Sequence, residues 1–221
     1  MTAAPPDAAF LDLDGCLVDS RSAISHCLNV GLEAVGATPR AVDRLHHLIG
    51  PPLHESFVAL LAEEELDPAL APRCVAAYRE AYRDVSLTET RPVPGVADAL
   101  SRVQGHLPLA VVTSKPAAFA EPILEVVRLA GFFAAVHAPS LHARAEPKAE
   151  TLARALADVA PSSPRASTVM VGDRHHDVDA GRACGTGTVG VTWGIGDRAE
   201  VSHADVLLDE PAGLAALLRS R

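Results

Sequence analysis

The spacing of apolar residues changes twice along the chain. An apolar run near the N-terminus ends at two carboxylates, and this pattern predicts a buried β-strand over residues 8–13. From residue 20 to about residue 88, apolar residues recur every three or four positions, as in Ile24, Leu28 and Leu32, which predicts amphipathic helices. Beyond residue 88, short β-rich runs alternate with helical segments. The pattern therefore predicts one strand, a helical region and then a series of alternating elements.

The alternating elements predict the fold class. Strands followed by helices, repeated along a chain, form a parallel sheet that helices cover on both faces. We therefore expect an α/β protein with a Rossmann-like parallel sheet in a core domain built from residues 1–19 and 89–221. Residues 20–88 would form an all-helical cap domain, inserted after strand one. The strands expected after the insertion are residues 107–113, 134–138, 168–172, 187–192 and 206–208, with helices starting near Pro116 and spanning residues 147–159.

Composition and charge narrow the classes of function. The chain has 221 residues, of which 48% are hydrophobic and 21% charged, as is typical of a globular protein. Its net charge of −9 argues against nucleic acid as the main partner, because phosphate backbones require a basic face. No apolar stretch reaches the roughly 18 residues of a membrane span, and no basic-then-apolar leader is present, so we expect no membrane association and a cytoplasmic location. Either a monomer or a homodimer is compatible with this composition.

Asp12 and Asp14 are the first candidates for chemistry. Side chains in a strand alternate between its faces, so two carboxylates two positions apart at a strand end lie on the same side. Such a pair suits a nucleophile beside its acid/base partner. Gly15 follows, where the backbone can turn, and an Asp-Gly pair is also common in simple turns that carry no chemistry. The pair alone therefore does not distinguish a catalytic site from a simple turn, and residues farther along the chain are needed to do so.

Further polar residues stand at the ends of predicted strands or at the start of a predicted helix. In open parallel sheets, ligands bind at the carboxyl ends of the strands, where such residues meet. Residues from several separate segments would thereby converge on the end of strand one. This edge of the sheet is predicted to gather Thr113, Ser114, Lys148, Asp173 and Asp177 around Asp12 and Asp14.

Four short motifs make the chain similar to a known family. In order they are FLDLDGCLVDS, VVTSK, PKAET and VGDRHHD, and together they span nearly the whole chain. They resemble the motifs of the haloacid dehalogenase superfamily, in its phosphatase branch with a helical cap after the first strand. Cys16 departs from the family pattern, in which threonine or another small residue is usual. Gly50-Pro51-Pro52 and the cap pattern resemble the phosphoglycolate phosphatase group, which implies a small phosphorylated acid as substrate.

The resemblance implies a magnesium-dependent phosphatase for small phosphorylated metabolites. Asp12 would attack phosphorus and form an aspartyl phosphate, while Asp14 would protonate the leaving alcohol and later activate water. Phosphoryl oxygens and carboxylates repel one another, so a cation is required, and Mg²⁺ prefers oxygen ligands. Its expected ligands are the carboxylates of Asp12 and Asp173 and the backbone carbonyl of Asp14. Asp177 would position a metal-bound water or orient its neighbours.

The phosphoryl group would be held by hydrogen-bond donors and one ammonium group. Thr113 and Lys148 are expected to act as catalytic and substrate-binding residues, through a hydroxyl and an ammonium that stabilise negative charge. Ser114 and backbone amides of the turn at Gly15 are expected to add substrate contacts. Lys115, by contrast, is expected to face solvent or to make supporting contacts.

Single residues separate the alternative activities. Asp14 argues against a dehalogenase, because a departing halide needs no acid. A phosphonatase of this family would need a lysine in the cap, and residues 20–88 contain none. A sugar-phosphate mutase uses the same aspartates and Mg²⁺, so it stays open as the alternative. A phospho-aspartate signalling domain is disfavoured, because its phosphorylated residue belongs to the third strand.

Overall fold

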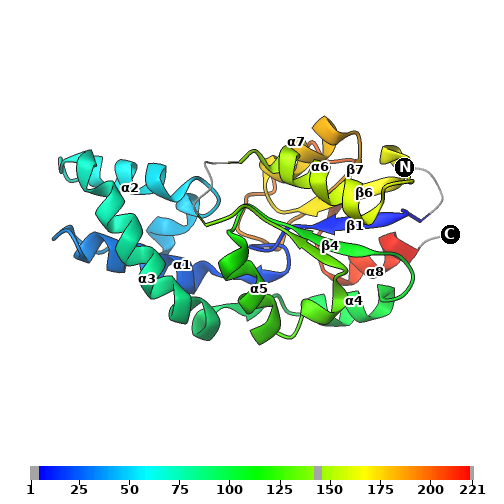
Figure 1. Cartoon of the computed structure of the whole chain (residues 1–221), viewed down its shortest axis with the longest axis horizontal. Helices are drawn as coiled ribbons and strands as arrows, with labels where there is room; N and C mark the ends of the chain where they lie inside the picture. The colour runs from blue at the N-terminus through cyan, green and yellow to red at the C-terminus, as the bar shows by residue number, and fades with distance from the viewer. Residues whose placement is uncertain (1–4, 142–145, 220–221) are drawn as a thin grey trace. The chain divides into compact units, whose positions relative to one another are not determined.

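Within residues 5–141 and 146–219, which the computed structural model describes, six parallel strands form one sheet (Figure 1). The chain divides into two compact units. One consists of Met1–Asp19 and Arg91–Arg221 and contains the sheet, and the other consists of Ser20–Thr90. The α/β class and the Rossmann-like sheet predicted from the sequence are confirmed in the first unit.

The order of the strands indicates that a ligand would bind beyond the end of β1. The sheet runs β5-β4-β1-β6-β7-β8, which is 3-2-1-4-5-6 when its strands are numbered along the chain, as in doubly wound nucleotide-binding folds. The order reverses between β1 and β6, and ligands bind beyond the carboxyl ends of the strands at such a reversal. A signalling receiver has the order 2-1-3-4-5, so the topology argues against that alternative. The strands are β1 (Ala8–Leu11), β4 (Leu109–Val112), β5 (Ala135–His137), β6 (Thr168–Gly172), β7 (Gly187–Val191) and β8 (Val206–Leu208).

Helices cover both faces of the sheet (Figure 1). On one face, Phe10 from β1, Met170 from β6 and Leu152 from α6 belong to a single buried cluster. Each large apolar side chain buried in this way stabilises the fold by about 1.5–3 kcal/mol. The helices of that face are α6 (Lys148–Val159) and α7 (His175–Cys184), and those of the opposite face are α4 (Val96–Val103), α5 (Ala117–Val126) and α8 (Ala212–Arg219).

The second unit is helical throughout, as predicted for residues 20–88. Its residues Phe57 and Tyr78 meet edge to face at 6.3 Å between ring centroids, and Tyr82 stacks on Tyr78 at 5.1 Å. These rings belong to the periodic apolar positions that predicted the helices. The helices are α1 (Arg21–Glu33), α2 (Leu53–Ala62) and α3 (Ala71–Glu89), with 3₁₀ turns at Val42–Leu48 and Pro68–Leu70.

Two very short strands join the segments that lead into and out of Ser20–Thr90. β2 (Val18–Asp19) pairs antiparallel with β3 (Arg91–Pro92). The sequence pattern does not predict this pair, because two residues are too few to show an alternation of apolar and polar positions. The chain therefore leaves and re-enters the first unit at neighbouring points.

The core strands are shorter than their apolar runs. β1 was expected to extend to Leu13 but ends at Leu11, where the backbone begins the turn that carries the two aspartates. β4 begins at Leu109, after a proline that has no N–H to donate to a neighbouring strand. The predicted bounds of β6 and β8 are confirmed. Among residues 5–141 and 146–219, no helix combines the length and hydrophobicity that crossing a bilayer requires.

Candidate active site

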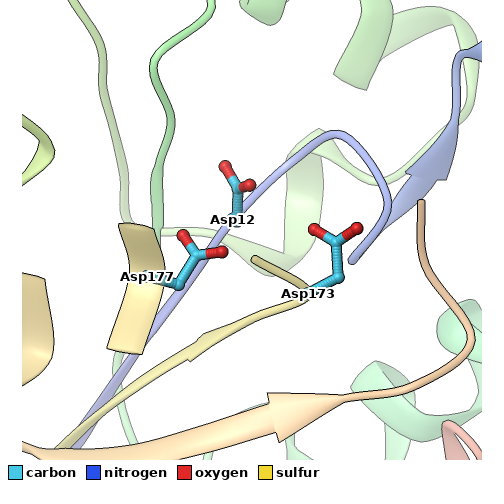
Figure 2. Close-up of side chains that lie close together, drawn as sticks. All are labelled: Asp12, Asp173 and Asp177. Carbon is cyan, nitrogen blue, oxygen red and sulfur yellow. The ribbon is translucent and has the colours of Figure 1, made fainter. Parts of the chain in front are cut away.

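Three carboxylates converge at the reversal of strand order. The register pairs Leu11 with Val171, so Asp12 and Asp173 follow neighbouring strands at the same edge of the sheet. Asp177 joins them from the first turn of α7. Figure 2 shows the three side chains, whose carboxylates point to the same side. One oxygen of each carboxylate lies within 4.8 Å of the others, and the residues are only 7%, 0% and 1% exposed.

Lys148 supplies a positive charge to this cluster. It is the first residue of α6, and its Nζ lies 2.8 Å from Asp12 Oδ1 and also contacts Asp177 Oδ1. The other oxygen of Asp177 accepts a hydrogen bond from the Arg174 amide at 3.0 Å. Asp177 is not the N-cap residue of α7, because the helix begins at His175. It stabilises the helix start and contacts Lys148, and its expected orienting role stays a prediction.

Burial strongly perturbs the acids. Burial, together with the Asp177 and Asp173 carboxylates, raises the pKa of Asp12 to about 8 against the opposing effect of Lys148. Burial and Asp177 likewise raise the pKa of Asp173 to about 6. Burial opposes the charge on Lys148, but the carboxylates of Asp12 and Asp177 outweigh it and raise the Lys148 pKa. When all three carboxylates are ionised, they and the Lys148 ammonium together carry two negative charges, which a divalent cation would neutralise.

Asp173 is arranged as a metal ligand would be. Its Oδ2 accepts hydrogen bonds from the amides of Ile195 and Gly196, at 2.7 and 3.1 Å. Its Oδ1 is buried and has no hydrogen-bond partner among the described residues. A buried carboxylate oxygen without a partner is costly unless a ligand satisfies it. The donor set is all oxygen and anionic, so it fits a hard cation such as Mg²⁺.

Asp14 lies outside the three-carboxylate cluster and pairs with a different lysine. Lys115 Nζ lies 2.7 Å from Asp14 Oδ1, and the two side chains are 6% and 17% exposed. The Lys115 side chain therefore makes a supporting contact, which is one of the two settings expected for it, and it does not face solvent. Its position could have indicated this setting, because Lys115 stands two residues after Thr113, at the end of the strand next to β1.

Thr113, Ser114 and Gly15 occupy different settings. Thr113 is buried after β4, and its Oγ1 accepts a hydrogen bond from the Lys115 amide, so the hydroxyl proton remains to donate elsewhere. Ser114 is exposed. The Gly15 amide donates to Val18 O at 2.8 Å within its own turn, and substrate contacts from the backbone amides of this turn stay a prediction.

Comparisons with known proteins agree with this geometry. The sequence profile of the family described as Haloacid dehalogenase-like hydrolase matches residues 9–191, which is more than half of the chain. The chain belongs to this family. A haloacid dehalogenase-like hydrolase is also what the motifs FLDLDGCLVDS and VGDRHHD indicated, and the structure gathers their aspartates in one site.

Relatives of this chain are named for different activities. It is 33% identical to a phosphoglycolate phosphatase of Agrobacterium fabrum, over 95% of this chain and 91% of that one. It is 34% identical to tyrosine-protein kinase PtkA of Mycobacterium tuberculosis over 86% of this chain, and the match spans only 64% of that kinase. Among solved structures, a putative phosphatase from Clostridium difficile superposes with a TM-score of 0.88 at 26% identity, covering 97% of this chain and 99% of that one.

Gly15, in the first motif of this chain, lies directly against the Asp173 carboxylate. Its φ is +84°, and a Cβ added there would lie 2.1 Å from Asp173 Oδ2. We expect Gly15→Ala to lower the free energy of unfolding by at least about 2 kcal/mol, because it adds a collision to the roughly 1–2 kcal/mol cost of a left-handed alanine. Urea denaturation measures this loss.

Gly105→Ala is the matched control for this prediction. Gly105 also has a positive φ, of +79°, but a Cβ there would meet nothing within 4 Å. We expect this variant to lose only the backbone cost, about 1 kcal/mol. Equal losses in the two variants would contradict the close approach of Gly15 to Asp173.

Proposed function

We propose that this hydrolase is a magnesium-dependent phosphatase that hydrolyses small phosphomonoesters through an aspartyl-phosphate intermediate. The observation that carries the proposal is that two aspartates of one turn have different charged partners. Asp12 faces Lys148 and two further carboxylates, whereas Asp14 faces Lys115. One acid thus lies in an environment suited to a nucleophile, and the other lies apart from it as a proton donor would.

Asp12 is the proposed nucleophile. One of its oxygens is held by the Lys148 ammonium at 2.8 Å, which leaves the second oxygen to attack phosphorus in line. The breaking bond to the ester oxygen releases the alcohol, and the phosphoryl group stays on Asp12. Lys148 stabilises the negative charge of both the carboxylate and the transferred group. Thr113, through its hydroxyl proton, is proposed to donate to a phosphoryl oxygen, and Ser114 to add a further contact.

Asp14 is the proposed acid and base. It would give its proton to the departing alkoxide and take one from the water that hydrolyses the aspartyl phosphate. Lys115 fixes its carboxylate by the 2.7 Å contact, so the two functions of the turn depend on two different lysines. This arrangement distinguishes the site from one that needs only a nucleophile.

The proposed resident cation is Mg²⁺, held by the carboxylates of Asp12 and Asp173 and the backbone carbonyl of Asp14, with Asp177 supporting the site. When bound, it would neutralise the phosphoryl oxygens and lower the repulsion between them and Asp12. The buried Asp173 Oδ1, which has no hydrogen-bond partner within the part of the chain that the structure describes, and the two excess negative charges of the fully ionised site support this assignment.

The substrate is proposed to be a small phosphorylated metabolite, with phosphoglycolate the first candidate. The relative from Agrobacterium fabrum, which bears that substrate in its name, matches nearly the full length of both chains. The net charge of −9 makes nucleic acid a poor partner.

The test is phosphate release from a panel of esters that includes phosphoglycolate, sugar phosphates and nucleoside monophosphates. We expect release to require Mg²⁺ and to fall at least about 100-fold in excess EDTA, with full recovery when Mg²⁺ is restored. Release at the full rate in EDTA would remove the metal from the proposal. Isomerised sugar phosphate with little free phosphate would instead favour the mutase.

Phosphoryl transfer to tyrosine is the second candidate function. It is favoured by the 34% identity to tyrosine-protein kinase PtkA, although that match leaves a third of the kinase uncovered. The same Asp12 could accept a phosphoryl group from ATP and pass it to a hydroxyl instead of water. Incubation with γ-labelled ATP and a tyrosine-containing peptide separates the two: a kinase labels the peptide, whereas a phosphatase releases only free phosphate.

A further inference from the structure

Residues 193–200, here called the 193–200 segment, pack their backbone onto Asp173. The amides of Ile195 and Gly196 both donate to Asp173 Oδ2, so this oxygen is fixed and Oδ1 is left without a partner among the described residues. The orientation of the carboxylate is therefore set by two backbone donors that come from far along the chain. A side chain could rotate away, but these donors move only if the segment moves.

The backbone of the segment lies so close to Asp173 that a side chain on either of its glycines would collide with this residue. A Cβ on Gly194 would lie 2.3 Å from Asp173 Cβ, and one on Gly196 would lie 2.2 Å from Asp173 O. Gly15, in the turn that follows Asp12 and Asp14, approaches the same carboxylate, since a Cβ added at Gly15 would lie 2.1 Å from Asp173 Oδ2. Asp173 is thus enclosed by the backbone of three glycines.

Two side chains anchor the ends of the segment. At its start, the Trp193 indole Nε1 donates to the Cys16 carbonyl at 3.1 Å, which joins the segment to the turn that follows Asp12. At its end, Glu200 accepts from Arg174 Nε at 2.8 Å and lies 3.0 Å from His175 Nδ1, which joins it to the turn that follows Asp173. The segment is therefore tied to both loops that carry the proposed metal ligands.

We infer that Trp193 and Glu200 are positioning residues that hold the 193–200 segment, and through it the Asp173 carboxylate, in the orientation that binds the cation. This inference rests on the proposed function, because it takes Asp173 as a metal ligand. Neither side chain belongs to the proposed set of metal ligands. Their effect is expected on metal affinity, since partners that orient a ligand typically contribute 10–100-fold to binding.

The experiment measures Mg²⁺ affinity by titration calorimetry in the intact protein and in three variants. Trp193→Phe keeps an aromatic ring and removes the indole donor, and Glu200→Gln removes the charge that holds Arg174. Ser202→Ala is the matched control, because the Ser202 hydroxyl donates to the nearby Ala199 carbonyl, at 2.7 Å, and to no other group among the described residues. Melting temperatures in EDTA are recorded for all four proteins.

We expect Trp193→Phe and Glu200→Gln to raise the Kd for Mg²⁺ about tenfold, while Ser202→Ala leaves it unchanged. A merely structural role would lower the melting temperature in EDTA, whereas a positioning role lowers the rise in melting temperature that Mg²⁺ causes. Because Trp193 is the single tryptophan of the chain, its fluorescence gives a second reading of metal binding in wild type and in Glu200→Gln.

Two different failures are distinguishable. If wild type binds Mg²⁺ and both anchor variants bind it equally well, the positioning inference is overturned and the proposed function stands. If wild type itself binds no divalent cation, the metal part of the proposed function fails and takes this inference with it. Should Trp193→Phe not fold, Glu200→Gln decides alone, since its site is partly exposed and its change is small.

Discussion

Asp12→Asn is expected to abolish phosphate release, with a fall in kcat of roughly 10⁴-fold or more, as for other enzymes that lose their nucleophile. The amide occupies the same space as the carboxylate but cannot form the acyl phosphate. Single-turnover assays with a labelled phosphate ester measure both release and covalent labelling, and both should disappear. Asp209→Asn, which changes an exposed carboxylate paired with Arg198, is the matched control and should retain activity.

Asp12→Asn should also be more stable than wild type in the absence of metal. Burial raises the pKa of Asp12 from 3.8 to about 8, so the folded protein binds this proton more tightly than the unfolded chain does. Stability from this group is present at low pH and is lost as pH rises from about 4 toward about 8. The melting temperature in EDTA should therefore fall less steeply with rising pH for Asp12→Asn than for wild type.

The activity prediction has its own contradicting outcome. If Asp12→Asn released phosphate at more than a few per cent of the wild-type rate, Asp12 would not be the nucleophile.

Lys148→Met is the second large effect that we expect. The ammonium is buried between Asp12 and Asp177, so its removal leaves buried carboxylates without their cationic partner. Breaking a buried pair in this way costs about 3–5 kcal/mol, which urea denaturation in EDTA measures. Phosphate release should fall by about 10²–10³-fold, because charge on the transferred group is no longer stabilised.

Arg154→Met is the matched control for this helix. Arg154 lies on α6 as Lys148 does, but it pairs with Glu146 near the surface and is 48% exposed. Its loss should change stability by no more than about 1 kcal/mol, as for other exposed pairs. If Lys148→Met is as stable and as active as Arg154→Met, the charge balance described for the site is wrong.

The sequence predicted the acidic cluster because its members stand next to apolar strands. Asp12 and Asp173 each follow a buried run, and the rule that parallel strands end at one edge of a sheet is sufficient to bring them together. The helical nature of residues 20–88 followed from apolar spacing for the same reason. These features are local patterns, and local patterns survive in a sequence.

The contacts made by backbone groups could not be predicted. The amides of Ile195 and Gly196 select one oxygen of Asp173, yet a backbone donor has the same chemistry in every residue and leaves no pattern. The β2–β3 pair was missed because each strand is too short to show periodicity. The sequence left two settings open for Lys115, solvent or a supporting contact, because its partner Asp14 lies 101 positions away, a separation at which spacing carries no information.

The position of β1 has a consequence for synthesis on the ribosome. Its four residues are fully buried, and their sheet partners in β4 and β6 are made about a hundred or more residues later. At roughly 5–20 residues per second, this hydrophobic strand waits for several seconds or more before a neighbour exists. A nascent chain is thus unable to assemble its acidic cluster until translation has passed Asp177, and a chaperone that shields the exposed strand would act within that interval.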